Sequence, residues 1–176
     1  MVGKRKRLKS REVSTPRLSS DASHSVEFFM RPDDGAVPSL ETFASWPNKA
    51  AGKLLPVLAA VAEAPPTKFA GGGKWEAMHG TCTGMYEVRA RIDGVHYRLF
   101  CVFDVFAENG DRPLLTVIDA DSKPNGEVFA ESRYVELSEL RDEYFRPDEN
   151  GRPVRSLAPA SPVSYTHLTL PTTPYV

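Results

Sequence analysis

Two residues, Asp93 and Gly94, constrain the fold of this chain more than any other feature of its sequence. They separate two runs, Met85–Ile92 and Val95–Phe106, in which apolar and polar side chains alternate. Such alternation is typical of a half-buried strand, and Asp-Gly favours the two-residue type I′ turn, which needs a positive φ at both positions. The sequence therefore predicts a β-hairpin that turns at Asp93-Gly94.

A two-residue turn fixes which residues face each other across the hairpin. One face is apolar, and we expect it to pack on a helix around Leu54–Val61; its pairs are Ile92 with Val95, Ala90 with Tyr97, Val88 with Leu99, and Tyr86 with Cys101. The opposite face is polar and largely basic; its pairs are Arg91 with His96, Arg89 with Arg98, and Glu87 with Phe100.

The cross-strand pair of Arg89 and Arg98 is open to two interpretations. Like charges directly opposite each other destabilise a strand pair, and the basic residues next to them add to the repulsion. In the first interpretation the cluster binds phosphate, which guanidinium groups hold in a bidentate fork, and Phe100 stacks on a base. In the second, it is an ordinary solvated sheet face, with Glu87 and the C-terminal helix compensating the charge.

Periodicity and helix-cap residues predict the other elements of an α+β domain. The expected elements are two strands, Ser25–Met30 and Pro113–Ala120, and three helices capped by Ser39, Asn48 and Ser132. Pro56 should bend the second helix, because proline removes a backbone donor. The glycine-rich stretch Thr67–Gly84 is expected to be a connection to the hairpin.

The 176-residue chain is long enough for one ordinary domain with a tail at each end. Residues 1–24 are basic and have no periodic apolar side chains, which indicates a disordered tail. A second disordered tail is expected over residues 147–176, and its end, Pro162–Val176, resembles translated sequencing adapter. Residues 25–146 form the expected domain.

Composition narrows the class of protein. The net charge of -1 gives the whole chain no attraction to nucleic acid, so charge is judged locally. The longest apolar stretch, Leu54–Ala62, is far shorter than the roughly 20 residues that cross a membrane. No apolar segment follows the basic N-terminus, so we do not expect a secretory signal, and we expect a cytoplasmic protein without a membrane partner. Cys82 and Cys101 make no disulfide framework. A zinc site is disfavoured, because His96 and Cys101 point to opposite faces of one strand.

The residues of the hairpin also carry a family resemblance. The strand Tyr86-Glu87-Val88-Arg89, followed by Tyr97-Arg98-Leu99-Phe100, resembles the signature of the RelE/ParE toxin superfamily, most closely its phage-derived, HigB-like branch. The segments Lys74–Gly80 and Ser122–Gly126 extend the resemblance, which covers about Ser25–Phe145. It implies a small twisted antiparallel sheet with N-terminal helices packed on one face and a C-terminal helix.

In function, the resemblance implies the toxin component of a type II toxin–antitoxin system. Such a toxin cleaves mRNA on the ribosome and is held inactive by a cognate antitoxin, expected here to have a helix-turn-helix. It uses no metal and no small-molecule cofactor: the ribose 2′-hydroxyl attacks the adjacent phosphate, and basic side chains stabilise the developing charge. The resemblance assigns catalysis to Arg89, Arg98 and Lys123, and we expect RNA binding by Lys74, Arg91, His96 and Phe100.

Three residues depart from the active members of this superfamily. Glu87 stands where a lysine is frequent, and Pro124 and Phe129 stand nearest to positions that often hold an arginine and a tyrosine. Phenylalanine has no hydroxyl to exchange a proton. These departures keep an alternative open, in which the chain is a non-catalytic interaction module of the same fold that binds a protein partner or RNA.

Overall fold

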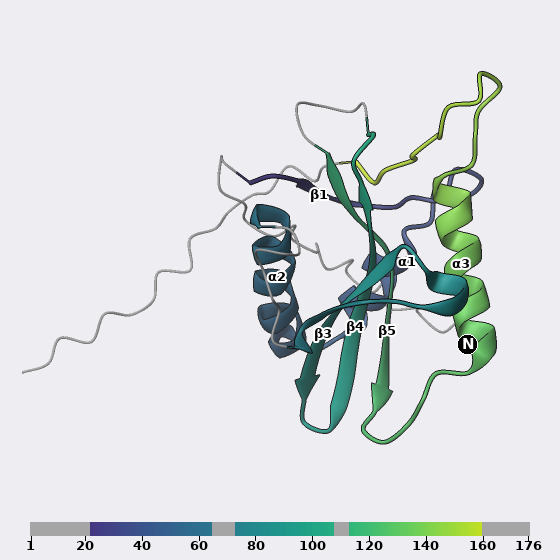
Figure 1. Cartoon of the computed structure of the whole chain (residues 1–176). Coiled ribbons are helices and arrows are strands. Elements are labelled where there is room, and N and C mark those ends of the chain that lie inside the picture. The colour runs from purple at the N-terminus through teal and green to yellow at the C-terminus, as the bar shows by residue number, and fades with distance from the viewer. Residues whose placement is uncertain (1–21, 65–72, 108–112, 160–176) are drawn as a thin grey trace, which may run out of the picture.

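The structure is a computed structural model that describes residues 22–64, 73–107 and 113–159. Within these residues it is an α+β fold with a five-stranded mixed sheet and three α-helices (Figure 1). The elements in chain order are β1 (Ser25–Phe28), α1 (Pro38–Ser45), α2 (Asn48–Glu63), β2 (Trp75–Ala77), the short 3₁₀ helix η2 (Gly80–Cys82), β3 (Met85–Ile92), β4 (Val95–Asp104), β5 (Leu114–Pro124) and α3 (Glu131–Tyr144).

The predicted hairpin is confirmed in position, turn and register. Asp93 and Gly94 have φ values of 50° and 79°, as a type I′ turn requires. Strands β3 and β4 pair in the expected register, from Ile92 opposite Val95 to Tyr86 opposite Cys101. The connection expected before the hairpin contains strand β2, which pairs antiparallel with the first half of β3. The second half of β3 therefore forms an open edge of the sheet.

The expectation of an antiparallel sheet is wrong at one edge. The strand order is β1-β5-β4-β3-β2, and β1 runs parallel to β5, with Ser25 opposite Leu114 and Phe28 opposite Val117. Parallel neighbours need a long connection, and here helices α1 and α2 and the other strands separate β1 from β5 in the chain. An alternating pattern reports the faces of a strand but not the direction of its neighbour.

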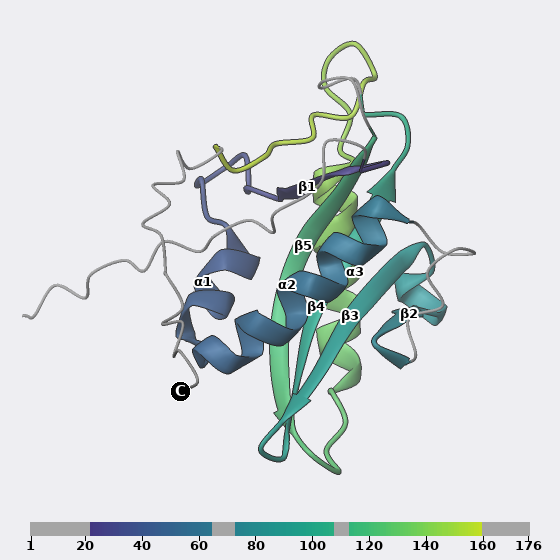
Figure 2. The same cartoon turned by 90° about the vertical axis from the view of Figure 1, so that its left-hand side faces the viewer.

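The sheet is covered on both faces. Helices α1 and α2 lie on one face and α3 lies on the other, so the molecule has three layers (Figure 1, and Figure 2 after a quarter turn). As predicted, Leu54 and Leu58 of α2 share a core with Val88 and Leu99 of the hairpin. The second core lies beneath α3 and contains Phe29, Phe100, Ile118, Leu137 and Tyr144.

The three predicted helix caps are wrong, although the helices exist. The N-cap positions are Val37, Pro47 and Ala130, and none of these three residues makes a side-chain cap hydrogen bond. Proline at the start of α1 supplies a preset φ in place of a cap, and Ser39 lies inside this helix. Pro56 lies within α2, as expected.

Both expected tails, 1–24 and 147–176, overlap the described structure, which begins at residue 22 and ends at residue 159. His24 is buried, and its backbone N–H donates to Ala62 O at 3.0 Å. Residues 147–159 were expected to be disordered, but this segment returns to the sheet, where Leu157 pairs with Phe29 of the chain just after β1. Arg155 then forms an ion pair with the buried Asp104. Residues 1–21 and 160–176 lie outside the described residues.

None of the helices in the described ranges is long and apolar enough to cross a membrane.

Candidate functional site

The α3-side face of the hairpin carries the pair that the sequence singled out. Arg89 lies directly opposite Arg98, and Arg98 lies opposite Asp121 of β5. Glu87 lies one position along β3 on the same face, opposite Phe100. The register therefore places two basic positions side by side, with one acidic position beside Arg98 on β5 and another next to Arg89 along β3.

Glu87 separates the charges of the two arginines. Its side chain is only 6% exposed and both of its carboxylate oxygens are used. Oε1 accepts from Nε of Arg89 at 2.7 Å and also from Nη2 of Arg89, while Oε2 accepts from Nη1 of Arg98 at 2.6 Å. Arg89 further pairs with Glu76 of β2 through Nη1. The repulsion expected from sequence is thus compensated by Glu87, as the second interpretation expected. The other compensating group is Glu76 of β2 and not helix α3, and the face around Glu87 and Arg98 is mostly buried rather than solvated.

Arg98 keeps hydrogen-bonding capacity that Arg89 does not. Its Nε is buried and has no hydrogen-bond partner among the described residues. Its side chain is 14% exposed, and its guanidinium carbon lies 5.4 Å from the centre of the Phe129 ring. The Nε–H of Arg98 is therefore a donor that the described residues leave unused, in a side chain that lines a groove along the open edge of β3.

Arg133 ties helix α3 to the same face. Its Nη2 donates to Asp119 Oδ2 at 2.6 Å and its Nε donates to Asp121 Oδ2 at 2.7 Å. Burial raises the pKa of Asp119, while the hydrogen bonds from Arg133 act in the opposite direction. No signal in the helical periodicity of α3 marked Arg133, because it becomes significant only where α3 meets β5.

A second set of basic residues lies nearer the hairpin turn. His96 lies between Arg91 of β3 and Lys123 of β5 in the sheet register. The Nε2 of His96 is 2.8 Å from Oδ1 of Asn125, whose backbone N–H donates to Gly94 O at 2.7 Å. Lys123 donates to the backbone oxygen of Glu127 and lies 5.3 Å from the Phe129 ring. The turn thus fixes the position of the imidazole.

A groove of about 770 Å³ runs along the open edge of β3. Its basic wall collects five of the predicted site residues, and no acidic residue of the described chain lines it. Lys53 of α2 adds a cation that the sequence did not indicate, and its Nζ lies 3.4 Å from Arg91 O. The basic lining residues are Lys53, Lys74, Arg89, Arg91, His96 and Arg98, and the others are Gly52, Pro56, Val57, Ala60, Gly73 and Ala90.

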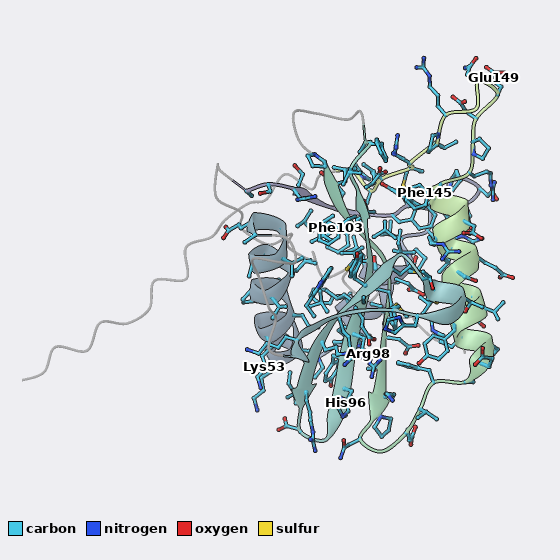
Figure 3. The ribbon with its side chains drawn as sticks, viewed as in Figure 1. Lys53, His96, Arg98, Phe103, Phe145 and Glu149 are labelled. Atoms are coloured by element: carbon cyan, nitrogen blue, oxygen red, sulfur yellow. The ribbon has the colours of Figure 1, made fainter. Side chains whose placement is uncertain are left out.

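Figure 3 shows Lys53, Arg98 and His96 in the half of the molecule that holds the hairpin turn. Two of the predicted site residues do not line the groove. Lys123 lies next to His96 in the register but outside the lining. Phe100 is fully buried beneath α3, with the Phe129 ring 6.2 Å away, so in this fold it offers no surface on which a base could stack.

Metal ligands are not grouped in the described ranges: no three histidine, cysteine or acidic side chains there are arranged to hold a metal ion. Cys101 is fully buried in the α2-side core, where the sequence expected a small core residue, and burial raises the pKa of its thiol. His96 lies on the other face, as predicted.

Comparison of the whole chain with protein-family models, with curated proteins and with solved structures gave no match.

Proposed function

We propose that the groove binds the phosphate backbone of single-stranded RNA and that the protein is a RelE-like toxin, a metal-free mRNA endonuclease of the cytoplasm. The observation that supports this most is the convergence of Lys74, Arg89, Arg91, His96 and Arg98. These residues were selected from sequence, and they line one groove with no acidic neighbour in its described lining. Polyanions bind such a groove by releasing counterions.

The free cations of the groove suit the RNA backbone. Among the described residues, Lys53, Lys74 and Arg91 have no carboxylate within ion-pair distance, so their charges are not neutralised by the protein. Arg91 lies at the open edge of β3, opposite His96 of β4, and lines the groove together with residues of α2. In this proposal the three side chains contact successive phosphates of the RNA and fix its position along the groove.

Arg98 is suited to contact the phosphate at which the RNA is cleaved. The 2′-oxygen forms a bond to phosphorus and the bond from phosphorus to the 5′-oxygen breaks, which leaves a 2′,3′-cyclic phosphate and a 5′-hydroxyl. The free edge of Arg98 donates to the phosphoryl oxygens as their charge grows. The 2′-hydroxyl loses a proton and the 5′-oxygen gains one, and the imidazole of His96 is the side chain in the described lining with a ring nitrogen that can take up or release a proton.

A second candidate function is supported by the neutralised charges. Glu87 and Glu76 occupy most of the hydrogen-bonding capacity of Arg89, and Phe129 has no hydroxyl. In that case the same fold is a non-catalytic module, and the groove binds RNA or an acidic segment of a protein partner. A cognate helix-turn-helix antitoxin is the partner that belongs to the first proposal.

The test is to express the full chain in a bacterium without an antitoxin and to map cut sites in mRNA. We expect growth arrest and cleavage within translated messages, and we expect Arg98→Ala to relieve both effects. Losing such a donor costs about 10²–10³ in rate. Lys49→Ala is the control, because Lys49 pairs with the exposed Asp93 and does not line the groove. A wild-type chain that neither arrests growth nor cuts mRNA would leave the interaction module as the function.

A further inference from the structure

We propose that Glu87 is a positioning residue that gives the two arginines different tasks: Arg89 braces the sheet edge, and Arg98 presents a free edge to the scissile phosphate. This inference rests on the proposed ribonuclease function. It concerns a carboxylate that lies outside the groove lining and touches no expected RNA group.

The hydrogen bonds of Arg89 show how it stabilises the edge of the sheet. Its Nε and Nη2, which form one edge of the guanidinium fork, both donate to Oε1 of Glu87. Its remaining nitrogen, Nη1, pairs with Glu76. Every nitrogen of Arg89 thus has a carboxylate partner, and its backbone N–H donates to Lys74 O at 2.7 Å. Arg89 links β2, β3 and Lys74 at the edge of the sheet.

The presenting role follows from how Arg98 differs. Glu87 takes only Nη1 of Arg98, at 2.6 Å. The opposite edge, formed by Nε and Nη2, has no hydrogen-bond partner in the described part of the chain, and Nε is buried. A fixed fork with two unused donors fits the two oxygens of a phosphate. Phe129 lies over the guanidinium and restricts its rotation.

Glu87 is the residue that keeps the roles of Arg89 and Arg98 different. The arginines are directly opposite each other in the register, so without the Glu87 carboxylate their charges repel. Arg89 then keeps only Glu76, while Arg98, whose side chain is 14% exposed, keeps no carboxylate partner among the described residues. Arg98 then loses the contact that fixes its Nη1, and its free edge no longer points consistently in one direction. A displacement of about 1 Å in such a group lowers a rate by about 10²-fold.

The experiment compares Glu87→Gln with Glu76→Gln in the full chain. Glutamine keeps the length of the side chain but removes the charge and one acceptor, and Glu76 is a matched control because it contacts Arg89 alone and is 51% exposed. We expect Glu87→Gln to slow single-turnover RNA cleavage by about 10²-fold. Its affinity for an uncleavable 2′-O-methyl RNA should be unchanged or tighter, because the groove gains net positive charge. Glu76→Gln should stay within about threefold of wild type in both the cleavage rate and the affinity for uncleavable RNA.

A purely structural role for Glu87 would lower cleavage and binding together, in proportion to the unfolded fraction seen by circular dichroism, and that result would overturn the inference. So would a Glu87→Gln variant that cleaves as fast as wild type. Resonances of the arginine Nε–H groups, recorded without RNA during titration with inorganic phosphate, separate the two proposals. If wild type cuts no RNA but Arg98 Nε–H shifts with phosphate, and this shift is lost in Glu87→Gln, only the proposed function fails. If phosphate shifts the Arg98 Nε–H resonance equally in wild type and in Glu87→Gln, the positioning role of Glu87 fails.

Discussion

His24 is the buried histidine of the described chain, and its ionisation links the stability of the fold to pH. It packs edge-on against Phe103, with ring centres 5.0 Å apart, and its Nδ1 has no partner in the described structure. Burial lowers the pKa of His24, because the charged imidazolium is disfavoured away from water. The stabilising effect of keeping it neutral is present above the unfolded pKa, near 6.5, and is lost as pH falls from there through the lower folded pKa.

We therefore expect His24→Phe to reduce the loss of stability between about pH 6.5 and pH 5. Phenylalanine keeps the ring contact and has no proton to bind. Urea unfolding at several pH values measures the effect as the difference in slope between variant and wild type. Equal slopes for the two proteins would show that His24 does not contribute to acid destabilisation.

The pair of Arg89 and Arg98 shows what sequence reasoning reaches at the scale of single residues. The turn fixed their positions opposite each other, and the resemblance singled both out for chemistry. The sequence did not predict the directions of their side chains. These directions depend on the buried carboxylate of Glu87 and on Glu76, which lies in a strand within the stretch that was expected to be a connection. The resemblance assigned catalysis to both arginines, whereas in the structure every nitrogen of Arg89 has a carboxylate partner and Arg98 Nε has none among the described residues.

Helix α3 is tied to strand β5 by the ion pairs of one residue, Arg133. Arg133 binds both Asp119 and Asp121, and the Asp119 side chain is only 7% exposed. Removing one partner leaves a buried charge uncompensated, which costs about 3–5 kcal/mol. We expect Arg133→Met to lower the free energy of unfolding by this amount, measured by urea titration.

A control and a rescue keep this prediction specific. Glu136→Gln removes an exposed partner of Arg133, so we expect a change within about 0.5 kcal/mol. Combining Arg133→Met with Asp119→Asn removes the unpaired charge and should recover part of the loss. A single Arg133→Met variant as stable as wild type would mean that the hydrophobic contacts of α3 hold it without this ion pair.

At the scale of elements, the sequence predicted best where a local rule acts alone. The hairpin was predicted in full because Asp93-Gly94 admits one turn and one register. Helix starts were misplaced because Ser39, Asn48 and Ser132 are good caps in isolation, whereas tertiary packing and prolines set the observed starts. The parallel pairing of β1 with β5 depends on contacts between segments far apart in the chain, which no local pattern records.

The whole molecule is completed by a C-terminal segment that sequence analysis assigned to a tail. Arg155 pairs with the buried Asp104, which also accepts a hydrogen bond from the Tyr144 hydroxyl at 3.0 Å, and Ala158 N–H donates to Phe28 O at 2.8 Å. Polar, proline-containing composition made this segment look disordered. Its order comes from one buried ion pair and a few backbone bonds to the chain around β1.

Shortening the chain to end at Arg146 tests this contribution. Asp104 loses its ion-pair partner Arg155 and the backbone hydrogen bonds of the segment are lost, so we expect the melting temperature to fall by about 10 °C. A chain that ends at Pro159 is the control and should melt with the full chain. If the chain ending at Arg146 melts at the same temperature as both, the segment adds nothing to the stability of the domain.

The candidate site was predicted in part, and the missing part has a common cause. The residues of the hairpin and Lys74 were found because a register and a resemblance point to them. Lys53, Glu76 and Arg133 belong to α2, β2 and α3, and they reach the site only through the packing of those elements on the hairpin. A charged residue on a helix surface gives no sign in sequence of which strand edge it will face.

The proposed binding of RNA to the groove through Lys53, Lys74 and Arg91 is tested most directly by the salt dependence of binding. The affinity of the full chain for a short uncleavable single-stranded RNA should fall with salt, and changing the three residues to alanine should reduce the slope of log K against log salt by about 2. Alanine at Lys49, Arg146 and Arg152, which lie outside the groove lining, should leave the slope close to that of wild type. A slope that is the same in all three proteins, or no binding by wild type at low salt, would contradict the claim.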